Sequence, residues 1–134
     1  MDLKALSIKL AETEIEGSRF ESLVISGEQD VLQVIVEDNS ELPIFVTRTD
    51  EQILCISYLF EASEVDSARV AELNATLLQL NIPVPLSAFA LIDGRYSIFG
   101  ALSVNSTFDD IAHEIATLAD NAVDALEALE EFLI

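Results

Sequence analysis

Basic residues are scarce in this chain of 134 residues, which contains six Lys and Arg against 25 Asp and Glu. The formal net charge is therefore −19 at pH 7. Affinity for nucleic acid comes mainly from Lys and Arg that displace counterions from phosphates, so this composition argues against a nucleic-acid-binding protein. The charge also repels anionic membranes. It either serves solubility alone or marks an acidic docking face, and a protein partner should then be basic or should contact an apolar patch.

Cysteine occurs once, at Cys55, so no disulfide can form within the chain. A single cysteine is consistent with the reducing cytosol. The longest apolar stretch, residues 82–92, is far shorter than the ~20 residues of a membrane span and contains Pro83 and Pro85. The first residues lack the continuous apolar segment of a signal peptide. We therefore expect a cytoplasmic protein with no segment inserted in a membrane.

Only one cluster of residues resembles a metal or acid–base site: Asp109, Asp110, His113 and Glu114. In a helix, residues four apart face the same way, which pairs 109 with 113 and 110 with 114. A single His supplies too few nitrogen or sulfur ligands for a transition metal. The favoured interpretation is a solvated first helical turn whose carboxylates suit the helix dipole. A metal or small-ligand sensor, or an enzyme that uses these four residues, is the alternative.

No other residue pattern points to chemistry. The four glycines, at positions 17, 27, 94 and 100, are too far apart for a phosphate-binding loop or a dinucleotide-binding fingerprint. Cys55 lies among apolar neighbours, which raise the pKa of a thiol, so it is expected in the core. Arg95 follows the Asp93–Gly94 turn and is expected to be a surface charge. We predict no catalytic residue, no metal and no cofactor.

Apolar residues are abundant, at 51% of the chain, and the mean hydropathy is +0.39. This content excludes disorder and suffices for a core, so residues 1–134 are expected to form a single domain. The pattern predicts an α+β protein with an antiparallel sheet of five to six strands, in the order α-β-β-β-(β)-α-β-β-α. The expected elements are a helix around residues 3–10, strands over 20–25, 31–36, 42–46 and 53–60, a helix from Ser63 to about Leu80, strands over 89–92 and 96–99, and a helix from Thr107 to Leu133.

Local signals support these boundaries. Asp93–Gly94 suits the tight turn of a hairpin, Ser63 and Thr107 are suitable N-caps, and Gly100 indicates a bulge or close packing. We expect the second and third helices to cover one face of the sheet. The residues expected to meet there are Leu73, Leu77, Ile115, Leu118 and Ala122 from the helices, with Val34, Ile56, Tyr58 and Ile98 from the sheet.

The segment 53–60 is apolar at seven of its eight positions, as in strands that are buried on both faces. The N-terminal helix is short for covering the second face. We therefore expect a homodimer in which another copy covers that face.

Several segments resemble the YjfI-like proteins, a bacterial family of unknown function. The segments are residues 30–36, 52–59, 80–89, 92–96 and 99–106, with His113-Glu114-Ile115 and Asp120-Asn121. The family has no established catalytic residues. Its members are encoded beside proteins similar to phage-shock protein A, which implies a role near envelope-stress machinery.

The order of elements, the size and the charge are also similar to those of type III secretion chaperones. The sequence thus favours a non-catalytic, chaperone-like adaptor that binds a protein. The family resemblance suggests a helical protein similar to phage-shock protein A as the partner.

Overall fold

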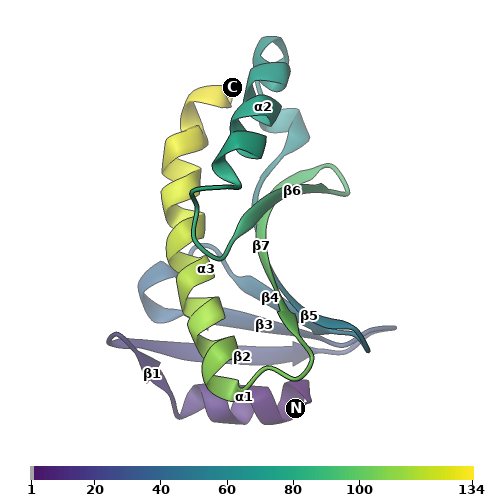
Figure 1. The fold of residues 1–134 in the computed structure, drawn as a ribbon, viewed down its shortest axis with the longest axis vertical. Helices are drawn as coiled ribbons and strands as arrows, with labels where there is room; N and C mark the ends of the chain where they lie inside the picture. Colours follow the sequence, from purple (N-terminus) through teal and green to yellow (C-terminus); the bar gives the residue numbers. More distant parts are fainter. Residues whose placement is uncertain (1) are drawn as a thin grey trace.

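The computed structural model describes residues 2–134 (Figure 1). Its helices are α1 (Leu3–Ala11), α2 (Val70–Leu80) and α3 (Phe108–Leu129). Its strands are β1 (Glu14–Ile15), β2 (Ser18–Ile25), β3 (Val31–Val36), β4 (Ile44–Arg48), β5 (Gln52–Glu61), β6 (Ala88–Ile92) and β7 (Arg95–Ser103). Short 3₁₀ turns are η1 (Glu37–Asn39), η2 (Ala62–Glu64), η3 (Ser67–Arg69) and η4 (Glu130–Phe132). In residues 2–134, no helix combines the length and the apolar character needed to cross a membrane.

The strands form one antiparallel sheet in the order β1-β2-β3-β4-β5-β7-β6. The expected α+β class is confirmed, with seven strands in place of five to six. The additional strand is β1. It has two residues, too few to show an alternating pattern, and its turn uses Glu16 and Gly17 at positive φ (49° and 86°). Glutamate is an unusual residue for that backbone region, so the sequence does not mark the turn.

Helix α2 begins at Val70, so the predicted start at Ser63 is wrong. Glu61 and Glu64 cap η2 reciprocally, and Asp66 caps η3 by accepting a hydrogen bond from the Ala68 N–H. Between these turns Val65 is extended, 4% exposed, and pairs with Leu133 in an isolated β-bridge. This bridge interrupts the helical path that the sequence pattern predicts.

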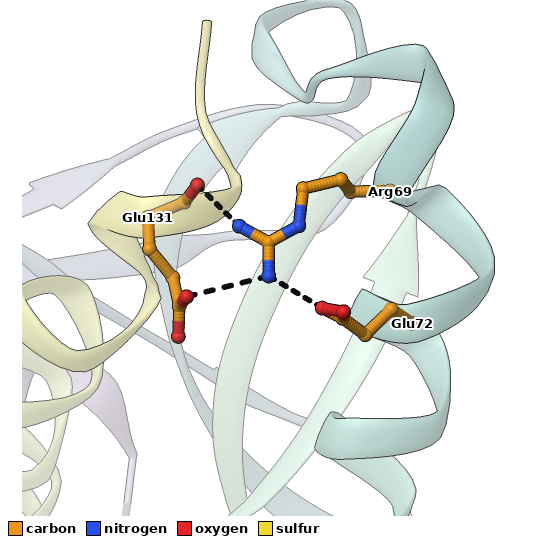
Figure 2. Close-up of polar contacts among 3 residues, drawn as sticks. All are labelled: Arg69, Glu72 and Glu131. Carbon is orange, nitrogen blue, oxygen red and sulfur yellow. Dashed lines mark hydrogen bonds and ion pairs between the residues drawn. The ribbon is translucent and has the colours of Figure 1, made fainter.

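The C-terminal end of α3 is held against the start of α2 by Arg69 (Figure 2). Its guanidinium donates to the backbone oxygen of Glu131 at 2.8 Å and forms ion pairs with Glu72 and Glu131. The same group lies 4.3 Å from the centre of the Phe132 ring. Thr107 caps the other end of α3, as predicted, by accepting from the Asp110 N–H.

All three helices pack on one face of the sheet. Helix α3 contacts β4, β5 and β7, while α1 contacts β2 and β3, where Ser7 and Ser22 are hydrogen-bonded at 2.6 Å. Within residues 2–134 no helix lies on the other face (Figure 1). The core therefore lies between the helices and one side of the sheet.

The side chains of β5 that face the helices differ from those that the sequence predicts. Ile53, Cys55 and Ser57 are buried, whereas Leu54, Ile56 and Tyr58 are half-buried and point to the other face. The prediction that Ile56 and Tyr58 meet α2 and α3 is therefore wrong by one residue. Val34 and Ile98, both fully buried, are on the helix-covered face as predicted. Residues 53–60 of this strand include one polar residue and so show no alternation from which to predict the register, and that residue, Ser57, is itself buried.

Candidate functional site

The uncovered side of the sheet, here called the open face, carries many apolar side chains, with the polar residues Gln33, Thr47 and Ser97 among them. Residues opposite each other on paired strands share a face, so the pairing identifies its members. The large apolar side chains are Leu23 and Ile25 from β2, Val31 and Ile35 from β3, Phe45 from β4, Leu54, Ile56 and Tyr58 from β5, and Phe99 from β7. Leu23 is 64% exposed and Ile25 is 41% exposed. Apolar side chains gathered on an uncovered surface are typical of a protein contact site.

Acidic side chains are nearly absent from the open face, although the chain contains 25 of them. At the outward positions of β2–β5 and β7 the carboxylates are Glu21 and, at the end of β5, Glu61. Arg95 lies opposite Glu61, and its guanidinium is 3.7 Å from the centre of the Tyr58 ring. Arg95 is therefore part of the rim of this face. The negative charge of the molecule is directed elsewhere.

A second apolar surface lies between α2 and β6, the outermost strand at one edge of the sheet. A groove of about 270 Å³ is lined there by Leu77, Leu78, Phe89, Leu91 and Tyr96, with Asn74 and Asn81. Leu78 and Leu91 are 71% and 57% exposed. The Tyr96 hydroxyl donates to Asn74, and Asn81 accepts from the Phe89 N–H at 2.6 Å. Asn81 thereby satisfies one backbone donor of β6 that faces α2.

The acidic cluster of α3 is divided by the structure. Asp109, Asp110 and His113 are exposed, as expected for a solvated first turn, but Glu114 is 7% exposed. Burial raises the pKa of the Glu114 carboxyl, because the charged form is poorly solvated there. Asp110, His113 and Glu114 line a hollow of about 350 Å³ together with Leu86, Ala101, Leu102 and Ser106, while Asp109 lies outside its lining.

Gly100 explains how Glu114 fits against the sheet. A Cβ atom at position 100 would overlap Oε1 and Cδ of Glu114, so the carboxyl group occupies the space that any other residue would fill. The expectation of close packing at Gly100 holds, and the partner is a carboxylate. The sequence does contain a signal for this burial: position 114 falls within the apolar stripe of Ile111, Ile115 and Leu118.

The remaining candidate residue, Cys55, has no base or cation among the described residues that favours its thiolate. Cys55 is fully buried, and burial with the nearby charge of Glu114 raises its pKa to about 12. A thiol of that pKa stays protonated at neutral pH and is a poor nucleophile. Among residues 2–134, no three His, Cys, Asp or Glu side chains are grouped so that they could hold a metal ion.

Comparison with known proteins identifies relatives of both the sequence and the fold. The chain is 28% identical over 116 residues to the uncharacterized protein YjfI of Escherichia coli K12, covering 84% of this chain and 86% of YjfI. Among solved structures it is similar to YbjN from E. coli, with a TM-score of 0.61 and 16% identity over 84% of this chain and 86% of that one.

A chain of the heterodimeric ExoU–SpcU complex from the type III secretion system of Pseudomonas aeruginosa is also similar. The TM-score is 0.58 and the identity 15%, over 97% of this chain and 99% of that chain. At such low identity the likeness shows the fold alone, and it confirms the expected type III secretion chaperone-like fold. The model of the bacterial family DUF2170, whose members are described as uncharacterized, matches residues 1–133, so this chain belongs to the DUF2170 family.

Proposed function

We propose that this chain is a non-catalytic, chaperone-like adaptor that binds a protein partner on its open face. The observation that carries the proposal is the group of apolar side chains from Leu23 to Phe99 on a face that no helix within residues 2–134 covers. On a molecule of net charge −19, a surface with so few carboxylates permits close approach of another chain. Burial of its apolar side chains supplies the favourable free energy, and the acidic remainder of the surface keeps the unbound protein soluble.

Two further observations support protein binding over catalysis. Burial and the charge of Glu114 both raise the pKa of the Cys55 thiol, whereas a nucleophile is activated by an adjacent base, a lowered pKa or a metal. A protein of the same fold, in the ExoU–SpcU structure, is part of a heterodimeric complex. We place the adaptor in the cytoplasm, in keeping with its single cysteine. On the family resemblance, a helical protein similar to phage-shock protein A is the first partner to test.

Pull-down at low salt with matched variants tests the proposal. Leu23→Asp places a charge on the open face at a residue that is 64% exposed. Ile8→Asp is the control, because it places the same charge on α1 at a residue that is 58% exposed. We expect a purified partner to be retained by the wild type and by Ile8→Asp, and lost with Leu23→Asp. Equal retention by both variants would show that the open face is not the binding surface.

We also propose that a second copy covers the open face when no other partner is bound, which gives a homodimer. A stable interface buries about 800 Å² on each partner, and side chains from five strands contribute to this surface. The charge opposes pairing, but screening at physiological salt limits the repulsion to about 8 Å. Light scattering over a range of ionic strengths tests this: a mass of 14.6 kDa at every salt concentration would rule out the homodimer.

A further inference from the structure

Glu114 is an acidic side chain at a buried position of α3. It is 7% exposed and lies on the helix face that carries Ile111 and Ile115 into the core. Its carboxyl rests on the backbone of β7 at Gly100, in space that a Cβ would fill. An isolated carboxylate in such a position is costly unless it has a hydrogen bond or a counter-charge.

The carboxyl of Glu114 has neither kind of partner. Among residues 2–134, none forms an ion pair or a hydrogen bond with it, and burial is the sole cause of its raised pKa. Glu114 lines a hollow together with Asp110 and His113. The hollow has apolar walls, formed by Leu86, Ala101 and Leu102, and its two carboxylates both come from α3. Apolar walls around carboxylates suit a cation on an aliphatic chain.

The hollow lies beside an open strand edge. Strand β6 pairs with β7 only as far as Phe99, so residues 100–103 of β7 have β5 on one side and, within residues 2–134, no neighbouring strand on the other. Ala101 in the wall of the hollow is opposite Leu54 of the open face. A polypeptide bound on the open face can therefore reach the hollow around the edge of β7.

We propose that this hollow receives a basic side chain, lysine or arginine, of the protein partner. The cation contacts Glu114 and Asp110, and the methylene groups lie against Leu86 and Leu102. A desolvated carboxylate gains more from such a pair than an exposed one does, because the surrounding dielectric is low. The inference rests on the proposed protein-binding function and adds the chemistry that the partner must present.

A probe of the side chain alone tests the hollow without needing the partner. N-acetyl-lysine amide and N-acetyl-arginine amide are titrated into the protein at pH 7.5, with N-acetyl-norleucine amide as the uncharged control. The readouts are the NMR shifts of the Gly100 amide and the Glu114 carboxyl. We expect saturable shifts with at least one basic probe, which also distinguishes ammonium from guanidinium, and none with the norleucine probe. Absence of saturable shifts with both basic probes would overturn the proposal.

Two variants of equal charge change provide the control. Glu114→Gln removes the buried charge and should lower the affinity for the basic probe at least tenfold. Asp109→Asn lies outside the hollow and should change that affinity less than twofold. Gly100→Ala is an independent variant that displaces the Glu114 carboxyl and should also lower the affinity for the probe. Equal binding by wild type and Glu114→Gln would contradict the proposal.

A pull-down of the partner then separates this inference from the proposed function. Loss of binding with Leu23→Asp and a tenfold weaker complex with Glu114→Gln would support both. Loss with Leu23→Asp but unchanged affinity with Glu114→Gln would leave the adaptor function standing and overturn the assignment of the hollow to the partner, even if the small probes bind.

Discussion

At the residue scale, one pair of positions shows both what the sequence reveals and what it hides. Gly100 was expected to mark a bulge or close packing; it marks close packing, but the residue packed on it is Glu114, which was expected to be solvated. Charged residues in the first turns of helices are usually exposed. The spatial coincidence of Gly100 and Glu114 depends on how α3 crosses β7, which no local pattern specifies.

Glu114→Gln should stabilise the protein at neutral pH, on the order of a few °C in Tm. The pKa of Glu114 is raised in the folded state, so the folded protein binds the proton more tightly than the unfolded chain does. The cost of the buried charge is then absent below the unfolded pKa and is fully present above the folded one. Thermal unfolding from pH 4 to pH 7 should show the advantage of the variant growing as pH rises. An advantage that shrinks over that range would mean that Glu114 has a counter-charge.

Gly100→Ala should destabilise the protein by about 1–3 kcal/mol, because the added Cβ overlaps the Glu114 carboxyl. Glu114→Ala in the same chain removes the overlap. The double variant should therefore lose less unfolding free energy than the sum of the losses in the two single variants. Urea unfolding of the four proteins measures this coupling. Additive losses would show that the two residues are not in contact.

At the scale of elements, the sequence predicted six of seven strands and all three helices, and it failed where local rules do not decide. Strand β1 was not predicted because Glu16, a residue type that does not indicate a turn, occupies a turn position at positive φ. The start of α2 was misplaced because Val65 pairs with Leu133, a contact between segments far apart in the chain. The register of β5 was wrong because an almost wholly apolar strand shows no alternation. The missing information is tertiary for α2 and β5, whereas for β1 it is a local backbone conformation that the residue type does not indicate.

Leu118→Asp tests the docking of α3 on the sheet. Leu118 is fully buried, so the substitution places an unpaired carboxylate in the core and should cost several kcal/mol, about the whole stability of such a domain. Leu78→Asp is the matched control, since Leu78 is a helical leucine that is 71% exposed. Circular dichroism should show a cooperative melt for Leu78→Asp alone. A cooperative melt of Leu118→Asp would mean that α3 is not packed as described.

At the scale of the whole molecule, helices and charge are distributed unequally between the two sides of the sheet. The three helices cover one side, and the open face keeps an apolar surface with Arg95 at its rim. Apolar content and net charge can be read from the sequence, but their separation in space cannot, because it depends on strand register. The homodimer was predicted from an uncovered second face, and α1 indeed packs on the same side as α3.

Methyl NMR of the protein labelled at Ile and Leu tests the central claim most directly, because it reports which surface another chain covers. The spectrum is followed through a dilution series of the protein alone and through a titration with the purified partner. We predict shifts concentrated at Leu23, Ile25, Leu54 and Ile56, with the methyl groups of Ile8 unchanged. Shifts confined to Leu78 and Leu91 in the groove between α2 and β6, or none in either series, would contradict the assignment of the open face as the binding surface.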